Sequence, residues 1–249
     1  MINTIEYNGR TISFDGYGKE HIIGGEGPIM VENFHVWPGD VVFDVGAGDS
    51  SWTLYALASG AAMVYAIEPS LPNYKKLVQD VLVNEGFFER SRLLNIGLDN
   101  HDNVKTLADW YIHIGGEEGL TLTDDCRVPI RFLPLDHFLP ELTRLDWVKM
   151  DIEGGEWYAM QGGKQTIEKF RPHLIIENHD QIQRIGPWMK SNSIVEKIYG
   201  RLRDLDYDIH ETTHANTTGR TFIIAHPRPG HPHHDQPHPP PHHTTEQEP

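Results

Sequence analysis

Apolar residues in this chain fall into short runs that alternate with stretches of helical spacing. The runs are rich in β-branched and aromatic side chains, which favour strands. Two of them, residues 41–45 and 63–67, are each closed by a polar or glycine-rich segment. Strands are also expected at residues 92–98, at 147–152 and from residue 174 onward.

Between these runs, apolar residues recur at the spacing of one helix face. The clearest case places Tyr74, Leu77, Val78, Val81 and Leu82 at positions i, i+3, i+4, i+7 and i+8. Helices are likewise expected over residues 51–59, 157–170 and 188–205.

The alternation of strands with helices predicts an α/β fold, with a mostly parallel sheet covered by helices on both faces. Two later runs, residues 207–210 and 221–225, are joined by the turn-rich stretch 216–219. This pair predicts one reversed strand at or near an edge of the sheet. In such a fold ligands bind beyond the carboxyl ends of the strands, which tells us where to look for chemistry.

The composition changes sharply at Pro227. The last 23 residues contain eight prolines and six histidines and almost no apolar side chains. Such a segment buries too little surface to offset the entropy of ordering, so we expect a disordered, polyproline-like tail. The sequence therefore predicts one folded domain over residues 1–226 and a solvated tail over 227–249. Loose metal binding by the tail histidines is the less favoured interpretation.

The formal net charge of −15 argues against nucleic acid and anionic membranes as partners, because both require a cationic surface. The single cysteine, Cys126, excludes an internal disulfide and fits a reducing compartment. No apolar run approaches the ~20 residues of a membrane helix, and residues 1–14 do not resemble a signal peptide. We therefore expect a cytoplasmic protein with a small-molecule or glycan partner; the oligomeric state is left open.

The segment Asp44-Val45-Gly46-Ala47-Gly48 joins the first predicted strand to the following helix. Its glycines permit a tight turn and close approach of a ligand to the backbone. Glu68 lies 20 residues beyond Gly48, after the second strand, where a carboxylate can accept hydrogen bonds from both ribose hydroxyls. A dinucleotide site requires a third glycine, but Ser51 stands there. A nucleoside cofactor without phosphate, S-adenosylmethionine, fits better.

Several segments, taken in order, resemble the FkbM family of S-adenosylmethionine-dependent methyltransferases. The most distinctive is the Lys-x-Asp-x-Glu-Gly-x-Glu pattern that begins at Lys149. One departure lies at residues 49–51, where the family more often has a small residue and a glycine. The matching segments are residues 42–48, 65–69, 94–99, 128–130, 135–136, 148–156 and 174–179.

This resemblance implies a class I methyltransferase fold, Rossmann-like, and O-methyl transfer, often to a hydroxyl of a sugar, glycan or small natural product. It also implies that Asp99, after the third strand, lies near the adenine of the cofactor. Together with the glycine loop, the cofactor-binding residues expected are Asp44, Gly46, Ala47, Gly48, Glu68, Pro69 and Asp99.

Catalytic candidates are polar residues at the ends of the fourth and fifth strands, because adjacent parallel strands end at the same edge. Asp151 ends the fourth strand, and Glu177 and His179 follow the fifth. A histidine that titrates near neutrality suits a general base. We therefore expect a metal-independent reaction in which Asp151 and His179 position and deprotonate the acceptor hydroxyl.

A metal-dependent alternative stays open. Asp151 with Glu177 and Asn178 is similar to the ligand set of metal-dependent catechol-type O-methyltransferases, with Glu in place of the second Asp. Three oxygen ligands suit Mg²⁺, although the longer Glu changes the geometry. Two further interpretations of the whole chain are a nucleotide-dependent dehydrogenase and a Rossmann-like nucleotide-binding module without methyltransferase activity.

Overall fold

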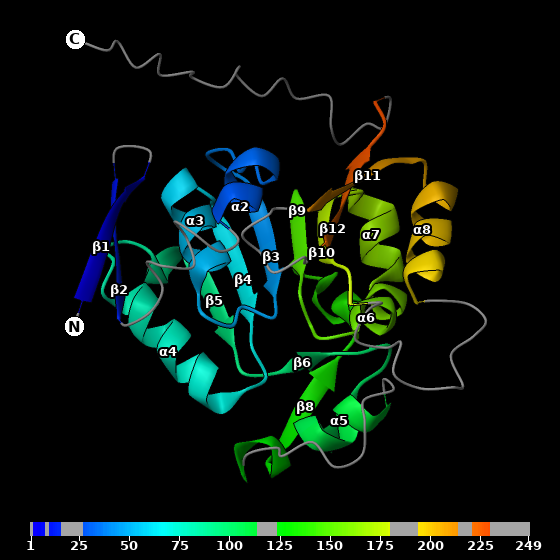
Figure 1. Cartoon of the computed structure of the whole chain (residues 1–249), viewed down its shortest axis with the longest axis horizontal. Coiled ribbons are helices and arrows are strands. Elements are labelled where there is room, and N and C mark those ends of the chain that lie inside the picture. Colours follow the sequence, from blue (N-terminus) through cyan, green and yellow to red (C-terminus); the bar gives the residue numbers. More distant parts are fainter. Residues whose placement is uncertain are drawn as a thin grey trace.

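The computed structural model describes residues 2–7, 10–15, 27–113, 124–179, 194–213 and 221–229, and its centre is a seven-stranded sheet (Figure 1). In order across the sheet, the strands are β11 (Tyr207–Thr213), β12 (Thr221–Pro227), β10 (His173–Glu177), β9 (Trp147–Met150), β3 (Val41–Val45), β4 (Met63–Ile67) and β5 (Ser91–Leu94). The strands from β10 to β5 run parallel to one another, whereas β12 is antiparallel to both of its neighbours. The expected mostly parallel sheet with one reversed strand is confirmed.

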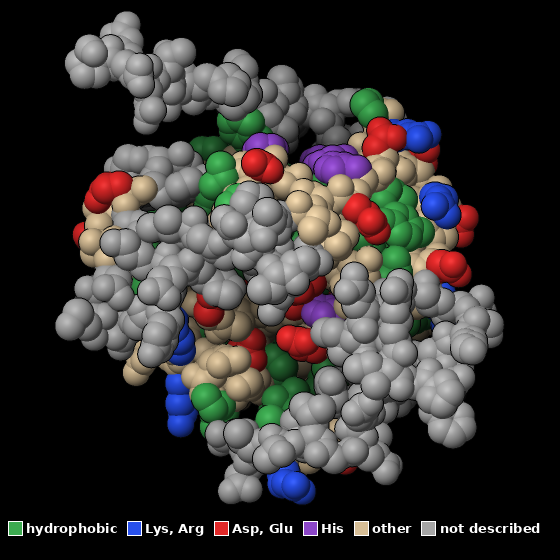
Figure 2. Space-filling model, in the orientation of Figure 1, with side chains coloured by type: hydrophobic (Ala, Val, Ile, Leu, Met, Phe, Trp, Pro, Cys, Tyr) green, Lys and Arg blue, Asp and Glu red, His purple; other side chains and the backbone are tan. Residues whose placement is uncertain are grey.

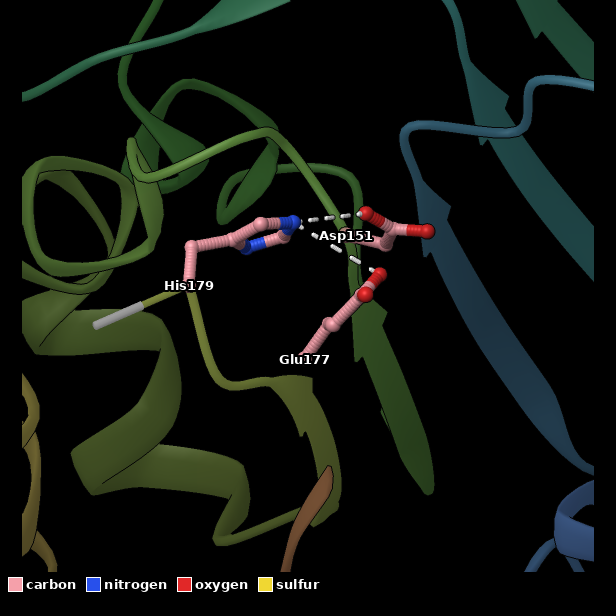
Figure 3. A group of neighbouring side chains, drawn as sticks. All are labelled: Asp151, Glu177 and His179. Carbon is pink, nitrogen blue, oxygen red and sulfur yellow. Dashed lines mark ion pairs between the residues drawn. The ribbon is translucent and has the colours of Figure 1, made fainter. Parts of the chain in front are cut away.

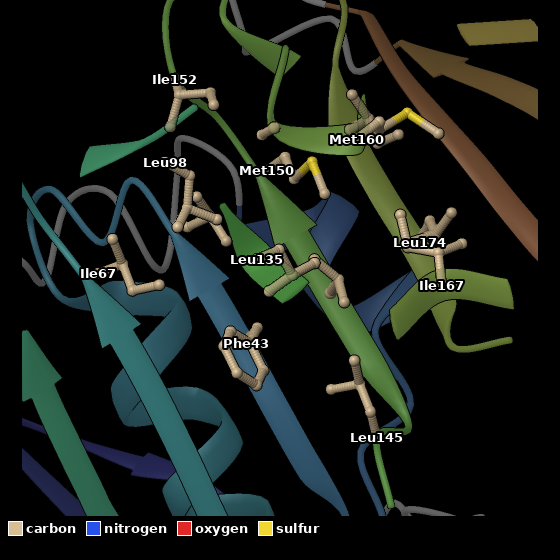
Figure 4. Packing of buried hydrophobic residues seen from close by; sticks show 14 of the residues in the cluster. Phe43, Ile67, Leu98, Leu135, Leu145, Met150, Ile152, Met160, Ile167 and Leu174 are labelled. Carbon is tan, nitrogen blue, oxygen red and sulfur yellow. The ribbon is translucent and has the colours of Figure 1, made fainter. Parts of the chain in front are cut away.

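Helices cover both faces of this sheet because successive strand residues point to opposite sides. One face packs on α2 (Gly27–Asn33), α3 (Ser51–Ser59) and α4 (Leu71–Leu82), whose buried residues share a core with Val42 and Val64. The other face packs on α6 (Glu156–Gly162), α7 (Lys164–Phe170) and α8 (Ile194–Asp204), around Phe43 and Met150 (Figure 4). Trp188, at the expected start of α8, lies outside the described residues.

An N-terminal hairpin extends the first of these two cores. It consists of β1 (Ile2–Tyr7) and β2 (Arg10–Asp15), which pair antiparallel. Ile12 and Phe14 are buried in the same core as Leu77 of α4. The side chain of Asn84 fixes the hairpin there, because it accepts a hydrogen bond from the Ser13 N–H and donates one to the Ser13 carbonyl, both at 2.8 Å. The sequence analysis predicted no strand in this region.

The single strand expected over residues 92–98 is wrong, because the chain leaves the central sheet after β5. Asn95 donates its side-chain amide to the carbonyls of Glu68 and Pro69, at 2.8 and 3.0 Å, and this turns the chain away. Beyond this turn the chain forms a small three-stranded sheet with a helix after its second strand. Its elements are β6 (Gly97–Leu98), β7 (Asn103–Thr106), α5 (Leu107–His113) and β8 (Pro129–Leu133).

The helix expected over residues 157–170 is two helices, α6 and α7, which meet at Gly163. A side chain at Gly163 would lie 2.7 Å from Leu135, so the chain approaches the preceding short turn closely. Asp136 in that turn accepts the N–H groups of Gln165 and Thr166, which caps α7. Three short 3₁₀ turns complete the described elements: Phe88–Arg90, Asp124–Arg127 and Leu135–Phe138.

The described residues extend to residue 229, past the domain boundary expected at residue 226, and that boundary stays a prediction. Strand β12 includes Pro227, and Arg228 forms ion pairs with Asp206 and Asp208, at 3.1 and 2.7 Å. The rest of the expected tail, residues 230–249, lies outside the described residues. Within the described part of the chain, no helix has the length and apolar character needed to span a membrane.

Candidate active site

The glycine loop after β3 passes directly over the end of β9. Gly46 has a φ of 79°, and a Cβ at this position would lie 1.9 Å from the backbone oxygen of Asp151. Only glycine satisfies both the positive φ and this close approach. The loop therefore brings the ends of β3 and β9 together, as the parallel order of these strands predicts.

Glu68 links this loop to the loop after β4. Its Oε2 accepts the Gly48 N–H at 2.8 Å, and its Oε1 accepts the Ser70 N–H at 2.7 Å. The side chain is buried, and burial raises the pKa of Glu68 although the two N–H donors act in the opposite direction. Each carboxylate oxygen keeps a second lone pair, so Glu68 can still accept hydrogen bonds from a ligand.

A cavity of about 270 Å³ lies beside Glu68, at the carboxyl ends of the central strands. One part of its wall is apolar and includes Trp110 and Phe132, whose rings stack at 5.7 Å. Another part of the wall is acidic, with Glu68, Asp151 and Glu153. The other lining residues are Val45, Gly46, Gly48, Ile67, Pro69, Ser70, Asn73, Gly97, Leu98, Leu107 and Ile152.

Asp44 does not line this cavity but supports it from beneath. It is fully buried, accepts a hydrogen bond from Thr53 at 2.6 Å and lies 3.4 Å from the Lys149 amino group. Burial raises the pKa of Asp44, while the charge of Lys149 opposes the shift. The same amino group donates to the Gly46 carbonyl at 2.7 Å and lies 3.9 Å from Asp151. The Asp44 carboxylate thus supports the glycine loop from beneath, and the cofactor-binding roles expected of Asp44 and Ala47 stay predictions.

Asp99 also has partners within the protein, and its expected place near the adenine of the cofactor stays a prediction. Its carboxylate is buried and accepts the Asn100 N–H, the Asn103 side chain and the Lys105 amino group. Burial alone would raise the pKa of Asp99, but these donors prevail and lower it. The carboxylate therefore stabilises the turn before β7. At this place the cavity is lined by Gly97 and Leu98, immediately before Asp99.

Asp151, Glu177 and His179 lie together, as the pairing of β9 with β10 requires (Figure 3). His179 Nε2 is 3.5 Å from Asp151 Oδ1 and 3.6 Å from Glu177 Oε2. Glu153 Oε2 is also 3.6 Å from this nitrogen. On the face shown in Figure 2, acidic side chains gather close to a histidine near the middle of the molecule.

Glu156 fixes the geometry of this cluster. Its Oε1 accepts the N–H groups of Ile152 and Gly154, at 3.0 and 3.3 Å, and so shapes the loop after Asp151. The same atom lies 2.9 Å from His179 Nδ1. Gly154 has a φ of 103°, which allows the sharp turn between Asp151 and α6. The sequence pattern from Lys149 to Glu156 is therefore explained residue by residue by contacts at the site.

Burial and neighbouring carboxylates act in opposite directions on the charge of His179. Burial of the ring favours its neutral form, but the carboxylates of Glu156, Glu177 and Asp151 prevail and raise the pKa of His179 to about 9. Three of the four carboxylates near the ring, those of Asp151, Glu153 and Glu156, follow one another after β9, and Glu177 comes from β10. The role of His179 as a general base stays a prediction.

Sequence reasoning missed Lys149 as a structural cation and the apolar wall of the cavity. Lys149 stands inside the quoted pattern, and its position two residues before Asp151 on one strand was a usable signal. No local signal marks Trp110 or Phe132, because the small sheet brings them to the cavity from outside the central strands. Trp110 also packs on the loop after Asp151, where a Cβ on Gly155 would lie 2.2 Å from its ring.

Comparison with known proteins gives one family and a set of similar folds. The family model described as the methyltransferase FkbM domain matches residues 44–209, more than half of the chain. Among solved structures, a methyltransferase FkbM from Methylobacillus flagellatus KT aligns with a TM-score of 0.54 and 20% identity. The alignment covers 76% of this chain and 44% of that protein, so this chain spans less than half of its length.

Other solved structures are less similar. An rRNA methylase from Streptococcus thermophilus aligns with a TM-score of 0.46 and 14% identity over 78% of this chain and 90% of that one. A precorrin 8W decarboxylase from Methanobacterium thermoautotrophicum aligns with a TM-score of 0.45 and 16% identity, over 81% and 88% of the two chains. A search of the curated proteins found no match. The expected class I methyltransferase fold agrees with the sheet order and with the FkbM alignment.

Proposed function

Because the chain belongs to the FkbM methyltransferase family, we propose that it transfers the methyl group of S-adenosylmethionine to a hydroxyl group of a sugar, glycan or small natural product. The observation that carries this proposal is the charge of the cavity wall. Among the described residues that line the cavity, three are acidic and none is Lys or Arg. A sulfonium cation is stabilised in such surroundings, whereas the pyrophosphate of a dinucleotide is not.

The residues of the cavity fit the other parts of this cofactor. Glu68 offers carboxylate oxygens to the two ribose hydroxyls, beside the backbone of Gly46 and Gly48. The apolar wall formed by Leu98, Trp110 and Phe132 gives the adenine ring flat hydrophobic partners. Glu68 lies where the apolar and acidic parts of the wall meet. This position suits S-adenosylmethionine, in which the ribose lies between the adenine and the sulfonium.

When bound, S-adenosylmethionine supplies a methyl group on a positively charged sulfur, and the carbon–sulfur bond breaks with its electron pair on sulfur. The acceptor oxygen forms the new bond to carbon and must lose its proton. Asp151 lines the cavity, whereas the side chains of Glu177 and His179 lie behind it. We propose that the Asp151 carboxylate accepts the proton of the acceptor hydroxyl. Lys149 and His179 lie near this carboxylate and position it. A positioned base of this kind contributes typically about 10²–10⁴-fold to the rate.

The cytoplasmic location and a small-molecule or glycan acceptor, rather than nucleic acid or membrane, remain part of this proposal. The location rests on the single cysteine, and the class of acceptor rests on the net charge of −15 and on the acidic cavity wall. A polyanionic acceptor would approach these carboxylates against charge repulsion.

The proposal is tested by calorimetry with S-adenosylhomocysteine and with NAD⁺. We expect the wild type to bind S-adenosylhomocysteine and not NAD⁺. Glu68→Gln should weaken that binding about 10- to 100-fold, because ribose hydroxyls then lack a charged acceptor, which costs ~1–3 kcal/mol. The matched control is Glu141→Gln, which changes an exposed carboxylate away from the cavity and should leave the affinity unchanged.

Methyl transfer is then measured with labelled S-adenosylmethionine and fractionated glycans and small metabolites. Label should enter a hydroxyl-bearing fraction with the wild type and with Glu141→Gln, and far more slowly with Glu68→Gln. A wild type that gives no heat with S-adenosylhomocysteine, or that binds NAD⁺ instead, would exclude the proposed cofactor.

A further inference from the structure

The group formed by Asp151, Glu177 and His179 has the composition of a metal site. Each residue offers one ligand atom, and these atoms all lie within 4.8 Å of one another. We propose that the three side chains bind one divalent transition-metal cation at the edge of the cofactor cavity. This inference departs from the metal-independent reaction expected from the sequence, and its role in catalysis rests on the proposed function.

The distances from His179 Nε2 to the two carboxylates fit shared ligands of a cation better than they fit hydrogen bonds. Asp151 Oδ1 and Glu177 Oε2 lie 3.5 and 3.6 Å away, beyond the usual hydrogen-bond range. Ligand atoms about 2.1 Å from one tetrahedral ion lie about 3.4 Å apart, close to these separations. The distances from the imidazole nitrogen to both carboxylates therefore match those between ligands of one ion.

The burial and surroundings of His179 are a second, independent observation. The side chain is 5% exposed, so both ring nitrogens need partners inside the protein. Nε2 points into the group of carboxylates, while Nδ1 faces the buried Glu156 carboxylate at 2.9 Å. A carboxylate behind the second ring nitrogen is the arrangement that orients metal-bound histidines in proteins. Glu156 is itself held by two backbone N–H groups, so the ring direction is fixed in advance.

The donor types select the class of cation. Two carboxylates with one imidazole suit Mn²⁺, Fe²⁺ or Zn²⁺, whereas Mg²⁺ prefers oxygen ligands alone. Three protein ligands leave further coordination positions, and Asp151 places the site at the cavity wall. An acceptor hydroxyl bound at such a position would lose its proton more readily, because the cation stabilises the alkoxide.

The test measures Mn²⁺ binding to the full chain after treatment with a chelator. Binding is monitored through the electron paramagnetic resonance signal of free Mn²⁺. Mn²⁺ is the probe because imidazole-rich segments, such as the six histidines after Pro227, hold it less tightly than Ni²⁺, Cu²⁺ or Zn²⁺. We expect the wild type to bind one Mn²⁺ and to melt at a higher temperature when Mn²⁺ is present. Asp151→Asn, Glu177→Gln and His179→Gln should each weaken binding at least tenfold.

Glu156→Gln should weaken Mn²⁺ binding by about tenfold, because the Glu156 side chain orients His179 and does not itself bind the ion. His101→Gln and Glu141→Gln change exposed side chains elsewhere and should bind Mn²⁺ like the wild type. S-adenosylhomocysteine is titrated into every variant, and Glu177→Gln and His179→Gln should keep its affinity because they do not line the cavity. That titration also verifies folding.

The inference is overturned if the wild type neither binds Mn²⁺ at millimolar concentration nor gains melting temperature from it. Binding that survives equally in all three ligand variants would likewise overturn it, and would place the ion elsewhere, for instance on the C-terminal histidines. These results leave the proposed function standing as long as S-adenosylhomocysteine binds. Loss of S-adenosylhomocysteine binding in the wild type, in contrast, refutes the proposed function whatever Mn²⁺ does.

Discussion

At the residue scale, Lys149 connects the parts of the active site that come from different strands. Its amino group lies on β9, contacts Asp44 on β3 and donates to the Gly46 carbonyl, and the residue is 2% exposed. A buried ion pair contributes little net stability compared with an apolar pair, but losing one partner leaves an uncompensated charge. The buried Lys149 cation thus helps to hold the glycine loop, together with Glu68 and the carbonyl of Ile67.

Lys149→Met should lower the free energy of unfolding by about 3 kcal/mol at pH 7, measured by urea denaturation. The double variant Asp44→Asn/Lys149→Met should recover part of this loss, because no buried charge is then left alone. Lys164→Met, which changes an exposed lysine, should alter stability only slightly. A double variant no more stable than Lys149→Met would show that the charge of Asp44 is not the cause.

The same substitution predicts a pH dependence. Burial raises the pKa of Asp44, so the folded state holds a proton there more readily than the unfolded state does. Stability linked to such a group is present at low pH and is lost as the pH rises through the folded pKa. Without Lys149 the pKa of Asp44 rises further. The loss in free energy of unfolding caused by Lys149→Met should therefore be smaller at pH 5 than at pH 8. An equal deficit at both values would contradict this explanation.

At the scale of elements, helix ends in this protein are set by contacts from distant parts of the chain. The apolar spacing of residues 157–170 is continuous, yet α6 ends at Gly162 and α7 begins at Lys164. Asp136 supplies the acceptor for the free N–H groups of α7 from 30 residues away. The break directs α6 toward the loop after Asp151, where Glu156 in its first turn reaches His179.

Asp136→Ala should destabilise the protein by about 1 kcal/mol, because two N–H groups at the start of α7 lose their acceptor. Thermal or urea unfolding measures the change. Glu168→Ala on the same helix removes only an exposed carboxylate paired with Arg201 and serves as the control. If the two variants lose the same stability, the cap is not what holds the end of the helix.

At the scale of the whole molecule, two hydrophobic cores lie on opposite faces of the sheet, and the small sheet of β6, β7 and β8 adds the apolar wall of the cavity. The N-terminal hairpin belongs to one core and α8 to the other. The cavity lies at one end of the central strands, so both cores support it while leaving it open to a ligand.

Removal of residues 230–249 should leave the melting temperature and the affinity for S-adenosylhomocysteine nearly unchanged. The reason is composition, because this segment offers almost no apolar side chain that could pack on the body. Removal of residues 221–249 is the contrasting variant, since it takes β12 out of the sheet between β10 and β11 and should prevent folding. A fall of several degrees in the shorter deletion would show that the tail docks on the domain.

The sequence by itself determined the alternation of the central parallel strands with helices, the glycine loop followed by Glu68, and the meeting of Asp151, Glu177 and His179. These features follow from local periodicity and from the rule that parallel strands end at one edge. Only the tertiary structure decided that Lys149 neutralises Asp44, that Lys105 occupies the carboxylate of Asp99, and that His179 faces four carboxylates. The charge of a buried side chain and the geometry of a ligand site depend on which residues from distant parts of the chain share that buried space. No local sequence pattern gives the distances between such residues.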